Sequence, residues 1–234
     1  MAESVARRDV AVAISKGVFG AIPFVGPLAA EVIGILIPNQ RVDRIEALLK
    51  ALSAKVADFE EERLKKRFTE PGFIDVFEEG LVQASKALSD DRIQYVAALL
   101  KNGLSEEDAE AVRHKTLLSL LGELNDAEVI LLCSRIQDRQ RNKPFFERHA
   151  SIVNPPLAHM GSPQEEHDKA TIHEAHLAHL ERLRLLKRRY TVPSKGQPPE
   201  FDEKTGTLKS RGSDTTPLAR LLLRTIDLIG ADEE

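Results

Sequence analysis

The sequence predicts a mainly α-helical protein, a helical bundle with an apolar helical hairpin at its N-terminus and a small α/β domain at its C-terminus. Three observations support this prediction. Residues 17–38 form one apolar stretch punctuated by glycine and proline. Residues 41–136 alternate amphipathic segments with helix start and stop signals. The last third is less regular and contains short extended segments. At 234 residues the chain is long enough for two domains with a real core.

Composition narrows the classes of function. A hydrophobic share of 42% with 30% charged residues is ordinary for a folded protein. The formal charge of −4 provides no global attraction to nucleic acid or acidic lipid, so such binding needs a local basic patch. The single cysteine, Cys133, lies among apolar residues and is expected to be buried. We therefore expect a cytoplasmic protein, either free or peripheral to the inner membrane.

The apolar stretch at 17–38 is the feature around which the chain is organised. As an unbroken helix its 22 residues would just cross a hydrocarbon core of about 30 Å. Pro23 and Pro27 interrupt it, however, and Glu31 adds a charge, so a single membrane span is disfavoured. The prolines instead predict a helical hairpin within residues 1–40.

The small and the large residues of this hairpin have different predicted uses. Small residues recur every four positions at Gly26, Ala30 and Gly34, which lets another helix pack closely. The large apolar residues would contact a membrane or a partner protein, or else be buried as the core of a bundle. The predicted contact residues are Phe19, Ile22, Phe24, Val25, Leu28, Ile33, Ile35 and Leu36.

Residues 41–122 read as the amphipathic helices of the bundle. From 41 to 59 the apolar positions have heptad spacing, which indicates packing within the bundle or, alternatively, a short oligomerising stalk. Pro71-Gly72 then separates this helix from one ending near Leu88. Ser89 and Ser105 are predicted N-caps of the next two helices, and Asn102-Gly103 is the expected stop between them.

Residues 123–234 form the predicted C-terminal domain. Asn125 and Glu128 have the spacing of a capping box, and a long helix is expected to begin with Ser162 as its cap, Pro163 and Glu165. The same helix is expected to continue to the basic residues Arg182, Arg184, Lys187, Arg188 and Arg189. Short extended segments follow around Lys204-Thr-Gly206, and Thr216-Pro217 opens a last helix.

The order of these elements over residues 124–230 resembles a winged-helix domain. That resemblance implies DNA binding in many members of the family and protein contacts or scaffolding in others. The chain departs from the pattern because its basic residues cluster at the C-terminal end of the long helix, whereas Glu165 and Glu166 lie at the N-terminal end. The overall layout also resembles uncharacterised bacterial helical proteins, which implies no particular activity.

The sequence offers little catalytic chemistry. Six of the seven histidines fall between 149 and 179, and an adjacent pair among His173, His176 and His179 could share a zinc ion. A solvated histidine face is the alternative, since no cysteine pair completes a structural zinc site. The chain contains neither a phosphate-binding glycine loop nor a Ser-His-Asp motif, so we expect no cofactor and no enzymatic activity.

These observations favour a non-enzymatic protein that associates with a membrane or a partner through its N-terminal hairpin. The C-terminal domain would then bind a partner or regulate the hairpin. The alternative is a winged-helix DNA-binding regulator in which the hairpin is buried as core and the basic residues at 182–189 contact nucleic acid. Homo-oligomerisation is compatible with either function.

Overall fold

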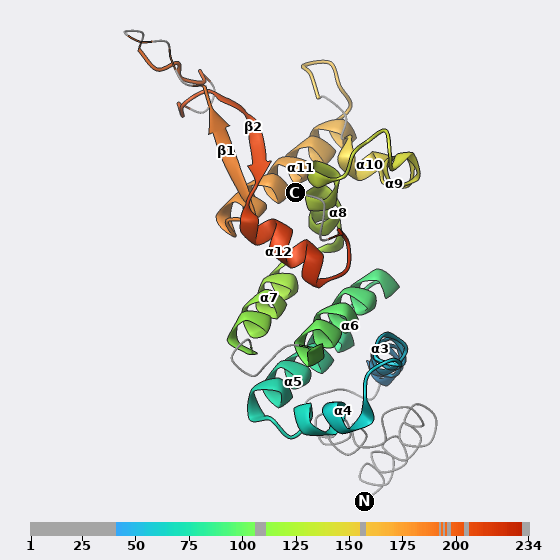
Figure 1. The fold of residues 1–234 in the computed structure, drawn as a ribbon. Coiled ribbons are helices and arrows are strands. Elements are labelled where there is room, and N and C mark those ends of the chain that lie inside the picture. The colour runs from blue at the N-terminus through green and yellow to red at the C-terminus, as the bar shows by residue number, and fades with distance from the viewer. Residues whose placement is uncertain are drawn as a thin grey trace, which may run out of the picture. The chain divides into compact units, whose positions relative to one another are not determined.

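The structure is a computed structural model that describes residues 41–105, 111–154, 158–191, 193, 195, 198–203 and 206–230. The described residues are mainly helical, with a small two-stranded antiparallel sheet. The chain divides into two compact units (Figure 1). Of the described residues, those from 41 to 123 and 225–227 belong to unit 1, and those from 124 to 224 and 228–230 belong to unit 2. None of the described helices combines the length and the apolar composition needed to cross a bilayer.

Five described helices build unit 1. α5 packs on α3, α6 and α7, and α6 also contacts α3 and α7. Two buried arginines donate hydrogen bonds to backbone carbonyls near the C-terminal ends of α6 and α7. Arg67 bonds to the carbonyl of Gly103 at 2.8 Å, and Arg92 bonds to that of Leu121 at 2.7 Å. The helices are α3 (Val42–Lys55), α4 (Glu61–Arg67), α5 (Pro71–Lys86), α6 (Asp90–Ser105) and α7 (Ala111–Glu123).

Two expectations about these helices were wrong in detail. The helix expected to run to Phe59 ends at Lys55, because the chain turns after Val56 before α4 begins. The stop expected at Asn102-Gly103 does not operate, since α6 continues to Ser105 with Gly103 buried against Phe73 and His114. Ser89 does cap α6, because its hydroxyl accepts a hydrogen bond from the backbone N–H of Arg92. The predicted cap at Ser105 falls partly on residues 106–110, which lie outside the described residues.

Three buried phenylalanines contact one another in the core of unit 1. Phe68 meets Phe73 and Phe77 edge to face, with ring centroids 5.0 and 5.2 Å apart. Such pairs add about 0.5–1.5 kcal/mol beyond the burial of their apolar area. The seam of α3 is buried too, since Ile45, Leu49 and Leu52 are at most 2% exposed. These three heptad-spaced residues of α3 therefore belong to the core of their own unit.

Replacing Phe77 with alanine tests this core. The side chain is fully buried, so the Phe77→Ala variant should lose about 3–5 kcal/mol of unfolding free energy in urea denaturation. Leu88→Ala is the matched control, because Leu88 is 91% exposed and its truncation should change stability by less than about 0.5 kcal/mol. Equal losses in the two variants would contradict the assignment.

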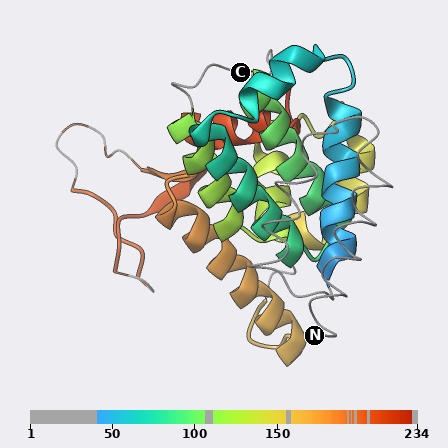
Figure 2. The ribbon, with the colours of Figure 1, turned by 90° about the horizontal axis from the view of Figure 1, so that it is seen from below.

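Unit 2 combines helices with a two-stranded ribbon. α8 contacts α10, α11 and β2, and α11 leads directly into β1. The ribbon of β1 and β2 projects away from the helices of its own unit (Figure 1, Figure 2). The elements are α8 (Asp126–Ile136), α9 (Lys143–Arg148), α10 (Ala150–Val153), α11 (Gln164–Arg182), β1 (Leu186–Tyr190), β2 (Ser210–Thr215) and α12 (Pro217–Thr225).

Several features of unit 2 that the sequence predicts can be compared with the structure. The capping box at the start of α8 is confirmed, with Asn125 and Glu128 bonded reciprocally. Thr216 is confirmed as the start of α12, since its hydroxyl accepts from the N–H of Ala219 at 3.2 Å. Cys133 is buried, as expected. The box expected at α11 was wrong: Pro163 is the N-cap, with no side-chain cap bond, and the Ser162 hydroxyl accepts from the N–H of His159 instead.

The largest correction concerns the end of the long helix. Instead of continuing through 189, α11 ends at Arg182, and Lys187, Arg188 and Arg189 lie in β1. The helix closes with two backbone bonds, from the N–H of Arg184 to the carbonyl of Glu181 and from that of Leu185 to the carbonyl of Leu180. This is the Schellman arrangement, in which the residue after the cap adopts a positive φ. Here Arg184, with φ of 60°, takes the place that glycine usually occupies.

Candidate functional site

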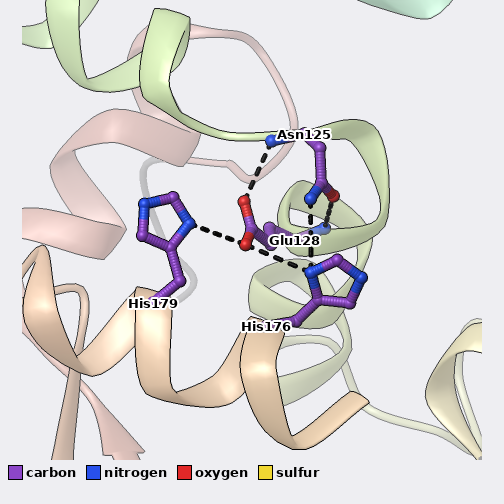
Figure 3. A network of polar contacts seen from close by, with 4 residues as sticks. All are labelled: Asn125, Glu128, His176 and His179. Carbon is purple, nitrogen blue, oxygen red and sulfur yellow. Dashed lines mark hydrogen bonds and ion pairs between the residues drawn. The ribbon is translucent and has the colours of Figure 1, made fainter. Parts of the chain in front are cut away.

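Unit 2 contains a buried carboxylate that is contacted by two histidines of α11 and by the backbone N–H that precedes α8 (Figure 3). Glu128 stands in the first turn of α8 and is 2% exposed. One of its oxygens accepts the backbone N–H of Asn125, which is its share of the capping box, at 2.9 Å. The other oxygen lies 2.7 Å from Nδ1 of His179 and 3.2 Å from Nδ1 of His176. A buried carboxylate is costly without donors, and here α11 supplies them.

His176 has two contacts at the same nitrogen. Oδ1 of Asn125 is committed to the N–H of Glu128, so its Nδ2 amide faces Nδ1 of His176 at 3.2 Å. An amide N–H can donate only to an unprotonated Nδ1, whereas the Glu128 carboxylate can accept only from a protonated Nδ1. The two contacts are therefore alternatives. His179 has no such competitor in this network and donates to Glu128 (Figure 3).

The third histidine of the predicted metal group has different surroundings. His173 is bonded to the backbone of Ile152, in α10, while His176 and His179 meet Glu128. Within the part of the chain that the structure describes, no group of three or more His, Cys, Asp or Glu side chains is arranged to hold a metal ion. In the structure, His176 and His179 of α11 instead contact Glu128 of α8 and so link the two helices.

Replacing Glu128 tests how strongly α8 and α11 depend on this link. Glu128→Ala should lower the free energy of unfolding by about 2–4 kcal/mol, because one cap bond and a shared acceptor are lost inside the unit. Glu128→Gln should lose less, since an amide oxygen can still complete the capping box. Urea denaturation measures both, with the exposed Glu174→Ala as control. A Glu128→Ala variant as stable as the control would contradict this role.

His173 gives the stability of unit 2 a defined pH dependence. Burial lowers the pKa of His173 below its usual 6.5, and the charges of Arg135 and His176 act in the same direction. The unfolded chain therefore binds this proton more readily than the folded one. The stability that neutral His173 contributes should be complete above about pH 6.5 and should be lost as the pH falls below that value. In denaturation series across this range, His173→Gln should flatten the dependence; a steeper dependence would contradict the sign.

The second feature of unit 2 is a basic ribbon, which we define as residues 184–215. It carries eight Lys and Arg against four Asp and Glu, a formal charge of +4 in a chain whose total is −4. Part of this charge is neutralised locally, because Arg189 pairs with Asp214 and Lys209 with Glu200. Lys187 and Arg211 are exposed and form no ion pair with any other described residue.

An irregularity in the strand pairing shapes the basic ribbon. Arg188 pairs with Ser213 and Tyr190 with Ser210, so two residues of β2 stand opposite the single Arg189. Gly212 lies in this bulge with φ of 107°, a conformation that side-chain-bearing residues rarely adopt. A bulge increases the local twist of a ribbon, and this one lies beside the cluster of basic residues.

A recess of about 850 Å³ opens where the basic ribbon meets the end of α11. Three of the five basic residues predicted from the sequence line it: Arg184, Lys187 and Arg188. Its other lining residues are Glu181, Leu186, Tyr190 and Thr216. The hydrogen bonds and the charge of Glu181 raise the pKa of Arg188, which remains a cation. Arg182 lies at the end of α11 and Arg189 in β1, both outside this recess.

The predicted contact residues of the apolar hairpin, Phe19 to Leu36, and its small residues Gly26, Ala30 and Gly34 lie outside the described residues. The recess was missed in the sequence because its basic residues were assigned to a helix; the aromatic Tyr190 next to three cations is the signal that could have indicated it. No family model, curated protein or solved structure matches this chain.

Proposed function

We propose that this is a non-enzymatic interaction protein whose C-terminal unit binds nucleic acid through the basic ribbon. The observation that carries the proposal is the concentration of positive charge on a projecting two-stranded element of an otherwise acidic chain (Figure 2). A phosphate backbone attracts such a patch and releases counterions when it binds, whatever the net charge of the rest of the protein. Two-stranded ribbons fit into the grooves of duplex DNA.

The surroundings of α11 favour the ribbon over the helix as the contact element. The first turn of α11 carries Glu165 and Glu166, and these carboxylates would repel phosphate. Lys169 keeps Glu165 ionised, because its hydrogen bond and charge lower the pKa of that carboxyl. The cations, by contrast, follow Arg182 and lie in and beside β1. If unit 2 resembles a winged-helix domain, its two-stranded ribbon is the wing. The wing, and not the long helix, would then contact the nucleic acid.

Salt dependence of DNA binding tests this proposal. The double variant Lys187→Gln/Arg211→Gln removes two exposed cations and should bind duplex DNA at least about tenfold more weakly at low salt. The slope of log affinity against log salt should fall by about 2, one for each lost phosphate contact. The measurement is fluorescence anisotropy with labelled duplex across a salt series.

A matched control distinguishes the patch from total charge. Lys50→Gln/Lys86→Gln makes the same change in charge on exposed positions of unit 1 and should leave the affinity and the slope unaltered. Absence of any salt-sensitive binding by the wild-type chain, or equal losses in the two double variants, would contradict the proposed function.

The apolar segment at 17–38 carries a second candidate function, docking on a lipid surface or a partner. Its length, its large apolar residues and the break at Pro23 and Pro27 support an interfacial hairpin rather than a span. The two functions are compatible, because they involve separate parts of the chain.

Flotation with lipid vesicles tests the second function. The wild-type chain should float with the vesicles, and Phe24→Asp/Val25→Asp should remain at the bottom of the gradient, since two carboxylates at the turn oppose insertion. Leu88→Asp is the control, because Leu88 is 91% exposed outside the segment. If the wild-type chain does not float, and replacing Gly26, Ala30 and Gly34 with leucine unfolds it without lipid, the segment is core.

A further inference from the structure

The recess at the base of the basic ribbon has the composition of a nucleotide site. Its three cations outnumber its one carboxylate, and the carboxylate is already engaged by Arg188. Its volume of about 850 Å³ falls in the range of sites that hold one small molecule. Leu186, 2% exposed, is the apolar member of the lining. The recess therefore has the charge and the room to hold a phosphate-bearing unit.

Arg188 is held in a way that leaves its phosphate-binding atoms available. Both oxygens of Glu181 lie at Nε of Arg188, at 3.0 and 2.9 Å. The two terminal nitrogens of the guanidinium form no hydrogen bond with another described residue. Those nitrogens form the fork that matches a phosphate oxygen pair, and an arginine fixed through Nε loses less side-chain entropy when it binds.

Arg184 occupies a backbone position that favours glycine. A non-glycine residue in the left-handed region costs about 1–2 kcal/mol, and the Schellman end of α11 places Arg184 there with φ of 60°. The turn is held by the residue that precedes α12, because the Thr216 hydroxyl donates to the carbonyl of Arg184 at 2.8 Å. The strained residue is thus one of the three cations that line the recess. Such strain is concentrated at functional sites in proteins.

Tyr190 adds a flat apolar surface to this charged setting. It is the last residue of β1 and is 47% exposed, so its ring is accessible to a ligand. Stacking of a nucleobase on an exposed aromatic ring contributes about 1–3 kcal/mol and requires a base that is not paired within a duplex. Exposed ring and cations lie in one recess, so a single ligand can use both.

We propose that this recess binds one unpaired nucleotide, with its phosphate on Arg184, Lys187 and Arg188 and its base stacked on Tyr190. The proposal rests on the nucleic-acid binding proposed above and adds that the base of the ribbon selects single-stranded or end-frayed nucleic acid. A free nucleoside monophosphate offers the same chemistry, and the experiment separates the two sources.

Fluorescence anisotropy with the full-length chain tests the site. The probes are a labelled single-stranded oligothymidylate of about twelve nucleotides, an abasic strand of the same length, a duplex, and adenosine monophosphate as competitor. The oligothymidylate should bind more tightly than the abasic strand. Tyr190→Ala should weaken the oligothymidylate about tenfold to a hundredfold and leave the abasic strand unaffected. Tyr190→Phe should restore most of the affinity, because the ring remains.

Arg184→Gly separates binding from folding. Glycine relieves the left-handed backbone, so this variant should melt at the same temperature as the wild-type chain or higher. The same variant should nevertheless bind the oligothymidylate about tenfold more weakly. Lys86→Gln, on unit 1, is the charge control. Loss of binding together with a lower melting temperature would overturn the assignment of Arg184.

The outcomes distinguish the two proposals. Displacement of the strand by millimolar adenosine monophosphate would place a single nucleotide in the recess, whereas stronger binding of the monophosphate than of the strand would identify a free nucleotide as the ligand. If the duplex binds and Tyr190→Ala has no effect on any probe, the recess proposal fails and the basic ribbon remains a duplex-binding element. If none of the probes binds, both proposals fail.

Discussion

The architecture of unit 2 depends on the contacts that the carboxylate of Glu128 makes between α8 and α11. This carboxylate is buried, it completes the cap of α8, and it accepts a hydrogen bond from His179 of α11 (Figure 3). A charge in such a place is tolerated only while its donors are present. The position of α11 on α8 is therefore specified by polar contacts as well as by apolar packing, and the end of α11 determines where the basic ribbon begins.

The place where α11 ends determines where the basic ribbon begins. The Schellman bonds of Arg184 and Leu185 stop α11 and turn the chain into β1. The bulge at Gly212 then modifies the twist of the strand pair beside its basic residues. The turn at Arg184 and the bulge at Gly212 thus lie beside the basic residues of the ribbon. The proposed binding of nucleic acid depends on the placement of these cations and not on any catalytic group.

Local signals in the sequence predicted much of the helical structure. The capping box at Asn125 and the start at Thr216 depend on contacts within three residues, and both could be found from spacing alone. The end of α11 could not, because an arginine stands where a glycine would have marked it. The contact between Glu128 and the histidines could not either, since it joins residues 48 and 51 positions apart. Proximity across such separations depends on tertiary packing.

The same separation has a consequence for the order in which the chain is made. During synthesis, α8 emerges from the ribosome about fifty residues before His179 does. Until then the Glu128 side chain lacks the partners that make its enclosure tolerable, and water must solvate it. The cap of α8 can form early, but enclosure of its first turn must wait for the arrival of α11. The C-terminal unit should accordingly mature late in translation, as one cooperative event, rather than helix by helix.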